Sequence, residues 1–184
     1  MTIPNIITVG RILLVPVIVY FIMTRAFEAA FAIFLIAGVS DAVDGIIARH
    51  FRQNSNLGAY LDPIADKALL VSIYVTLSIV QEIPLWLVLA VASRDILIVG
   101  GVLLSWMLDN PVPMKPLMIS KVNTAAQIAF AALVLANLAF DWFPREGLTV
   151  PAVGVAGLTI VSAMAYLRAW VGHMSAPEEG EDES

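Results

Sequence analysis

The sequence from Asp41 to Asp66 reads DAVDGIIARHFRQNSNLGAYLDPIAD and carries four aspartates between two apolar runs. Asp41 and Asp44 are three residues apart, and Asp62 and Asp66 are four residues apart. Both intervals bring side chains to the same face of an α-helix. The pattern therefore predicts two antiparallel helices that bring four carboxylates together at one end of the pair.

The rest of the chain is also strongly apolar. Of its 184 residues, 60% are hydrophobic and 14% are charged, and the mean hydropathy is +0.88. This is more apolar surface than one small soluble core can bury. Since a membrane-spanning helix needs about 20 mostly apolar residues, we predict an all-α integral membrane protein with six transmembrane helices and a short N-terminal interfacial helix. The interfacial segment is predicted over residues 2–11, and the spans over 10–23, 26–48, 57–80, 83–108, 122–143 and 150–171.

The charged residues divide the chain into a membrane domain, residues 1–174, and a disordered acidic tail, residues 175–184. The last seven residues hold five of the 15 acidic residues, so the other ten balance the ten Lys and Arg. Without a dense basic patch, nucleic acid is excluded as a partner. Without cysteine, disulfides, thiolate metal sites and cysteine nucleophiles are excluded.

The Lys and Arg residues predict the orientation, because cytoplasmic loops collect them. With the N-terminus inside, only Arg25 and Arg145 among the basic residues outside the spans fall on the far side. We therefore expect the four aspartates and both termini on the cytoplasmic (or matrix) side.

Four carboxylates at one membrane depth need cations between them. A charge within a span commonly costs about 2.5–3.5 kcal/mol, and two like charges ~4 Å apart repel by about 4 kcal/mol at an effective dielectric near 20. Either protons or metal ions must therefore occupy the gap. Oxygen ligands without cysteine favour Mg²⁺ or Mn²⁺ over zinc.

The residues beside the aspartates leave room for a bulky anion. Gly45 and Ala48 share a helical stripe with Asp41, and Gly58 lies on the predicted second helix. Arg49, one turn beyond Gly45, offers a forked cation that suits phosphate. We infer a metal-bridged phosphate or pyrophosphate between the two helices.

These residues resemble a known signature. The pattern from Asp41 to Arg49, followed after eight residues by Gly58 to Asp66, is similar without departure to that of the CDP-alcohol phosphotransferases, D-x2-D-G-x2-A-R-x8-G-x3-D-x3-D. The resemblance implies six spans, an interfacial N-terminal helix, a cytoplasm-facing site and a homodimer. It also implies transfer of a phosphatidyl group from a CDP-linked lipid such as CDP-diacylglycerol to an alcohol, with release of CMP.

The resemblance also implies roles for individual residues. Asp41, Asp44, Asp62 and Asp66 would hold two ions of Mg²⁺ or Mn²⁺, and Asp66 would also be the general base. A polar stripe near the N-terminus is similar to the family as well. The residues expected to bind the CDP-lipid are Asn5, Thr8, Asp41, Gly45, Ala48, Arg49 and Gly58.

The second half of the chain bears on the acceptor alcohol. Members that use glycerol 3-phosphate typically show an Arg-Glu pair in the fourth span followed by another basic residue, and a Gly-Lys-x-Lys-Thr entry to the fifth. Here Arg94 is followed by Asp95 and then by an uncharged stretch, and Asn123 replaces the second Lys. Fewer cations suit phosphatidylglycerol, whose phosphodiester carries one negative charge, better than a monoester with about 1.5–2.

The same stretches resemble the cardiolipin synthases of this family, so phosphatidylglycerol is the expected acceptor. Arg94, Lys121 and Asn123 are the residues expected to bind it. The alternative is glycerol 3-phosphate, as in a phosphatidylglycerophosphate synthase; inositol phosphate, serine and choline are further acceptors. The alternative is that Arg94 with Asp95, or Lys67 with Asp66, are structural partners within the membrane. Because adjacent helical residues point about 100° apart, neither pair is expected to make a good direct contact.

Two other classes of protein would also place acids in spans. A divalent-cation transporter would explain the carboxylates, but Arg49 would repel its cargo and the far halves of the second and third spans are nearly all apolar. A non-catalytic lipid-binding protein would tolerate loss of the base, yet Asp66 is present.

Overall fold

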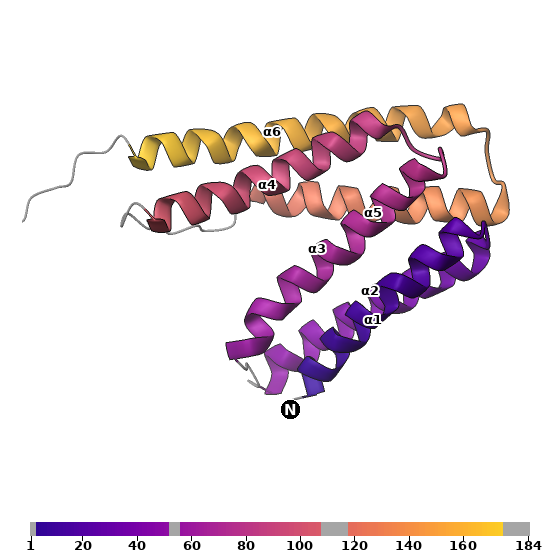
Figure 1. Cartoon of the computed structure of the whole chain (residues 1–184), viewed down its shortest axis with the longest axis horizontal. Coiled ribbons are helices and arrows are strands. Elements are labelled where there is room, and N and C mark those ends of the chain that lie inside the picture. The colour runs from indigo at the N-terminus through magenta and orange to yellow at the C-terminus, as the bar shows by residue number, and fades with distance from the viewer. Residues whose placement is uncertain (1–2, 52–55, 108–117, 175–184) are drawn as a thin grey trace, which may run out of the picture.

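The fold consists of helices throughout the part of the chain that the computed structural model describes, residues 3–51, 56–107 and 118–174 (Figure 1). No strand occurs in those ranges, so the all-α prediction is confirmed. Each predicted span coincides with one helix. The elements are α1 (Ile3–Met23), α2 (Phe27–Phe51), α3 (Asn56–Ile79), α4 (Leu85–Met107), α5 (Met118–Phe140), the 3₁₀ helix η1 (Arg145–Leu148) and α6 (Thr149–Met174).

One predicted boundary differs from the structure. The predicted interfacial segment, residues 2–11, runs into the first span, and α1 accordingly continues without a break from Ile3 to Met23. The connector predicted over 50–56 is shorter, since α2 reaches Phe51 and α3 begins at Asn56. Neither His50 nor Phe51 is a helix-breaking residue. The predicted tail, residues 175–184, lies outside the described residues.

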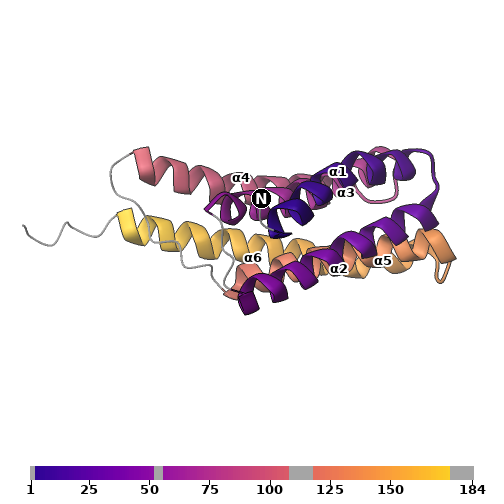
Figure 2. The ribbon, with the colours of Figure 1, turned by 90° about the horizontal axis from the view of Figure 1, so that it is seen from below.

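The helices form two layers (Figure 2). One layer holds α1, α3 and α4, and the other holds α2, α5 and α6. Contacts of α1 with α3, and of α2 with α5, hold neighbours within the layers, while contacts of α1 with α2 and of α4 with α6 join them. In Figure 1, α1, α2 and α3 are inclined to the other three helices, so that α3 and α4 approach at their connecting turn and separate away from it.

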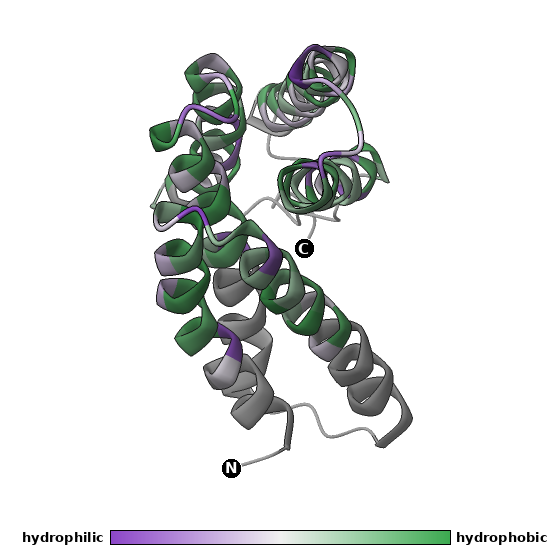
Figure 3. Cartoon of the chain, turned by 90° about the vertical axis from the view of Figure 1, so that its right-hand side faces the viewer, coloured by the Kyte–Doolittle hydropathy of each residue, from purple (hydrophilic) through white to green (hydrophobic). Residues whose placement is uncertain are grey.

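Apolar side chains both fill the core and cover the surface. Ile18, Tyr74, Leu87 and Leu135 are fully buried where the layers meet. Large apolar side chains are also exposed along the helices, and Ile96 is 71% exposed. Residues coloured as hydrophobic accordingly predominate along the described helices (Figure 3). Surface of this kind is typical of contact with lipid or with another protein.

Two helices in the described ranges are long and apolar enough to cross a membrane. They are the segments Met118–Phe140 and Arg145–Gly172. Shorter apolar stretches lie in the other helices, at Gly10–Met23, Phe27–Ser40 and Lys67–Ile79. The structure thus gives six helices, and six membrane spans stay a prediction.

The turns that follow α1 and α3 use left-handed residues other than glycine. Arg25 has φ 59° and Gln81 has φ 64°. In each turn the next N–H donates to a carbonyl five residues earlier, from Ala26 to Phe21 (2.9 Å) and from Glu82 to Leu77 (2.9 Å). This pattern satisfies the carbonyls left free at a helix C-terminus, so both helices end sharply.

Glu82 links three turns at this end of the molecule. Its Oε1 accepts from Arg25 Nη1 at 3.2 Å and from Arg145 Nη2 at 3.1 Å. The Glu82 side chain is 2% exposed, whereas both arginines are mostly exposed. One buried carboxylate therefore ties together the turns between α1 and α2, between α3 and α4, and between α5 and α6.

Candidate active site

The four-aspartate motif lies on two helices, as predicted. Asp41 and Asp44 belong to α2, and Asp62 and Asp66 belong to α3. The end of α2 and the start of α3 lie at the same end of the molecule as the start of α1 (Figure 1). The fold therefore brings together the three helix ends that carry the predicted metal and CDP-lipid residues, although the side chains of residues 3–9 and 41–66 are outside the description.

The chemistry of the four aspartates fits a divalent metal. Four carboxylates with no cysteine in the chain suit a hard divalent ion. Helical backbone at both aspartate pairs places each pair on one face. Among the side chains that the structure describes, no group of three His, Cys, Asp or Glu residues could hold a metal.

Arg94 occupies the centre of a buried polar cluster between α4, α5 and α6. Its side chain is 4% exposed. Nε and Nη2 donate to Ser162 Oγ in α6 at 3.3 and 3.0 Å. Nη2 also donates to Ser120 Oγ in α5, and the guanidinium lies 5.8 Å from the centre of the Tyr166 ring. Arg94 thus fastens three helices to one another.

The prediction that Arg94 and Asp95 do not touch is wrong. Arg94 Nη1 donates to Asp95 Oδ1 at 2.6 Å. The long, flexible Arg side chain spans the angle between adjacent positions, and burial favours the pair because an unpaired charge there would be costly.

Asp95 also pairs with α3. Lys67 Nζ lies 2.9 Å from Asp95 Oδ1, with side-chain exposures of 43% and 16%. Lys67 directly follows Asp66, the last aspartate of the motif. The ion pair therefore connects the motif-bearing half of α3 to the polar cluster around Arg94.

Asn123 belongs to a second buried polar group, between α5 and α6. Its Oδ1 accepts from Thr159 Oγ1 at 3.0 Å, and Gln127 Nε2 donates to the same Thr159 oxygen at 3.3 Å. Tyr74 of α3 donates to the Gln127 carbonyl at 3.0 Å. Asn123 is fully buried, and its Nδ2 has no hydrogen-bond partner within the described part of the chain.

Lys121 of the predicted acceptor site and Arg11, which was not a predicted site residue, differ in exposure. Lys121 is exposed next to Ser120, the partner of Arg94. Arg11 of α1, which continues the polar stripe of Asn5 and Thr8, is 2% exposed. It lines a small cavity with residues of α2, α3 and α5.

The residues that α6 adds to these clusters, Thr159, Ser162 and Tyr166, were not found by sequence reasoning. They are small polar or aromatic residues inside an apolar span, and none belongs to a chemical motif. A signal was available, because polar residues recur every three or four positions on two helices. The recurring residues are Ser120, Asn123 and Gln127 in α5, and Thr159, Ser162 and Tyr166 in α6.

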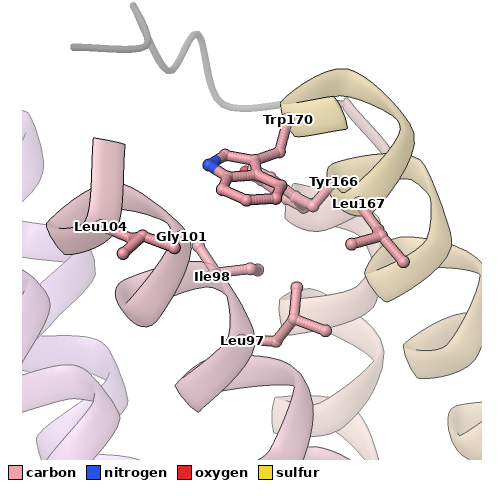
Figure 4. Close-up of a pocket in the computed structure, with 7 residues that line it drawn as sticks. All are labelled: Leu97, Ile98, Gly101, Leu104, Tyr166, Leu167 and Trp170. Carbon is pink, nitrogen blue, oxygen red and sulfur yellow. The ribbon is translucent and has the colours of Figure 1, made fainter. Parts of the chain in front are cut away.

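An apolar cavity of about 200 Å³ lies beside the Arg94 cluster, between α4 and α6 (Figure 4). Tyr166 lines it, and so do Leu97, Gly101 and Leu167. Trp170 closes one end, where its Nε1 donates to Ser105 Oγ at 2.8 Å. A second cavity, which Arg94 lines, adjoins the first one. The two cavities share Leu97 and Leu167 as lining residues.

Comparison with known proteins agrees with the motif. A family model described as CDP-alcohol phosphatidyltransferase matches residues 1–171. The chain belongs to the CDP-alcohol phosphatidyltransferase family. The resemblance seen in the motif is thereby confirmed, and family membership favours phosphatidyl transfer over cation transport as the basis of the four-aspartate pattern.

Relatives within the CDP-alcohol phosphatidyltransferase family carry two different names. Cardiolipin synthase (CMP-forming) from Rattus norvegicus is 35% identical over 181 residues, which cover 90% of this chain and 60% of the relative. The protein of that name from Homo sapiens is 36% identical, with the same coverage. CDP-diacylglycerol–glycerol-3-phosphate 3-phosphatidyltransferase from Pseudomonas fluorescens is 35% identical, covering 95% of this chain and 92% of the relative. The chain thus spans about 60% of the rat and human proteins.

Proposed function

We propose that the chain acts in phospholipid biosynthesis, transferring the phosphatidyl group of CDP-diacylglycerol to phosphatidylglycerol to give cardiolipin and CMP. The observation that carries the proposal is the complete eight-position motif on α2 and α3 within a family match over residues 1–171. The names of the rat and human relatives support the choice of product.

In this reaction the four aspartates have distinct tasks. Asp41, Asp44, Asp62 and Asp66 would hold two ions of Mg²⁺ or Mn²⁺, and these ions would supply positive charge to neutralise the diphosphate and stabilise CMP as a leaving group. The acceptor hydroxyl oxygen bonds to the lipid-side phosphorus, and the bond from that phosphorus to the CMP oxygen breaks. Asp66 takes the hydroxyl proton as general base.

The CDP-lipid is held by residues from the same ends of α1, α2 and α3. Glycine and alanine leave space beside the aspartates, and the Arg49 guanidinium binds the diphosphate. The complete set proposed for the CDP-lipid is Asn5, Thr8, Asp41, Gly45, Ala48, Arg49 and Gly58.

The acceptor is placed on the side of α4 and α5, where Arg94, Lys121 and Asn123 lie. Support comes from Asn123, whose fully buried Nδ2 has no partner in the described ranges. An unsatisfied buried donor costs about 1–3 kcal/mol, and an oxygen of the acceptor headgroup would relieve that cost.

A lipid acceptor also fits the surroundings of this cluster. Tyr166 contacts the Arg94 guanidinium and lines the apolar cavity between α4 and α6 (Figure 4). A phosphate near Arg94 would therefore have an apolar groove beside it for an acyl chain. Glycerol 3-phosphate has no acyl chain to place there.

The proposed setting is a membrane, with the protein as a multi-pass homodimer. The motif end and both termini face the cytoplasm or the matrix. The position of Arg25 and Arg145 supports this orientation, because both lie at the turns remote from the motif and cytoplasmic loops carry most basic residues.

A second candidate is transfer to glycerol 3-phosphate, giving phosphatidylglycerophosphate. The observation that favours it is the Pseudomonas fluorescens relative, of which this chain covers 92%.

The proposal is tested by CMP release from purified protein in mixed micelles with CDP-diacylglycerol, phosphatidylglycerol and Mg²⁺ or Mn²⁺. We expect turnover that stops on chelation and returns with the metal. Absence of CMP release with phosphatidylglycerol under both metals, while glycerol 3-phosphate supports it, would establish the second candidate instead.

A further inference from the structure

The ion pair between Lys67 and Asp95 lies directly beyond the four-aspartate motif. Lys67 Nζ is 2.9 Å from Asp95 Oδ1 and joins α3 to α4. Successive residues of an α-helix rise by about 1.5 Å along its axis. Lys67 therefore lies at nearly the same depth as Asp66, the proposed base.

Arg94 has little capacity left for a ligand. A guanidinium has five N–H donors, and four hydrogen bonds already run from Arg94 to Ser120, Ser162 and Asp95. Its side chain is 4% exposed. Of the residues proposed for the acceptor, Arg94 can therefore offer at most one N–H donor, and a phosphate there needs a second cation.

Lys67, unlike Arg94, is exposed and has N–H donors left for a ligand. Its side chain is 43% exposed, and an ammonium group has three donors, of which Asp95 uses one. Two donors therefore remain for another partner. A compact ammonium is a common partner of phosphate, so Lys67 is the cation of this cluster that is free to bind one.

The charge of the cluster is also suited to a phosphodiester. Lys67 and Arg94 are positive and Asp95 is negative, which leaves one net positive charge among these three side chains. The phosphodiester of phosphatidylglycerol carries one negative charge, whereas a phosphate monoester carries about 1.5–2.

We propose that Lys67 binds the phosphate of the acceptor and that Asp95 positions the Lys67 ammonium. The inference rests on the proposed function and names a residue of its acceptor subsite. Arg94 supports this pair, because its Nη1 donates to Asp95 Oδ1 and holds the carboxylate in place.

The test compares Lys67→Gln, Lys67→Met and Lys67→Arg with the wild type in mixed micelles. Apparent KM values are measured separately for phosphatidylglycerol and for CDP-diacylglycerol, and thermal unfolding checks that each variant is folded. The matched control is Arg168→Gln, which removes an exposed cation of α6. Glycerol 3-phosphate is offered in a parallel arm, so that a lipid phosphodiester and a free phosphate are distinguished.

Loss of a hydrogen bond to a charged group changes affinity about tenfold to a hundredfold. We expect Lys67→Gln and Lys67→Met to raise the KM for phosphatidylglycerol by about tenfold or more and to leave the KM for CDP-diacylglycerol unchanged. Lys67→Arg keeps the charge in a different shape and should raise that KM less than Lys67→Gln does, whereas Arg168→Gln should stay near the wild type. A rise confined to the glycerol 3-phosphate arm would retain the phosphate contact and reject the lipid acceptor.

The role of Asp95 is tested by a double-mutant cycle. Made in the wild-type chain, Asp95→Asn should raise the KM for the acceptor. Made in the Lys67→Gln variant, the same substitution should raise that KM by a much smaller factor. Equal effects in both backgrounds would reject the positioning role.

Two results separate failure of the inference from failure of the proposed function. An active wild type with unchanged acceptor KM in folded Lys67→Gln and Lys67→Met, or with only the CDP-diacylglycerol KM raised, overturns the inference alone. A wild type that releases no CMP with either acceptor overturns the proposed function and this inference with it.

Discussion

Replacing Arg94 by Gln should destabilise the fold markedly. The change removes a buried cation together with its hydrogen bonds to Ser162, Ser120 and Asp95. Removing one partner of a buried ion pair costs about 3–5 kcal/mol. Because Lys67 still neutralises Asp95, we expect the lower end, about 3 kcal/mol. One kcal/mol shifts the midpoint by about 2–4 °C in a chain of this size, so the midpoint should fall by about 6–12 °C.

The assay is thermal unfolding of the purified protein in detergent, followed by loss of the monodisperse peak after heating. Arg94→Lys should give an intermediate midpoint. The lysine ammonium keeps the charge, but it lacks the planar guanidinium that joins α4 to α5 and α6. Arg168→Gln is the control, since substitution of an exposed residue usually changes stability by less than about 0.5 kcal/mol. If Arg94→Gln unfolds at the same temperature as Arg168→Gln, Arg94 does not hold α4, α5 and α6 together.

Three further predictions concern the motif and the remote turns. Asp66→Asn should abolish CMP release while retaining most binding of CDP-diacylglycerol, because the amide cannot accept the hydroxyl proton; unchanged CMP release would remove Asp66 from the role of base. Arg49→Ala should weaken CDP-diacylglycerol binding by about tenfold or more, measured by equilibrium binding, and unaltered affinity would show that the diphosphate is bound elsewhere. Glu82→Gln should lower the unfolding midpoint, since it weakens the contacts with Arg25 and Arg145. Because both arginines are mostly exposed, we expect a loss of about 1–2 kcal/mol, and a midpoint equal to that of the wild type would contradict the linking of the three turns.

The helices were predictable because hydropathy and helix length are properties of short segments. Long apolar runs between polar or Pro-containing connectors located all six helices. Pairs at three- and four-residue spacing likewise placed the aspartates on two helix faces, and the structure shows helical backbone at those positions. Gly10 does not interrupt α1, because one glycine costs only about 1 kcal/mol in a helix.

Contacts between helices distant in sequence were not predictable in the same way. Ser162 and Thr159 look like ordinary small residues of a span until α6 packs beside α4 and α5. The Arg94–Asp95 contact was missed because the angle between adjacent positions says nothing of the reach of a long side chain. Similarly, Arg25 and Gln81 adopt a left-handed backbone that sequence rules assign first to glycine.

The most direct test of the account offers both acceptors at once. Purified protein in vesicles with CDP-diacylglycerol, phosphatidylglycerol, glycerol 3-phosphate and Mg²⁺ is sampled over time, and its lipid products are identified by mass spectrometry. The account predicts cardiolipin, formed in step with CMP. Phosphatidylglycerophosphate as the sole lipid product would contradict it.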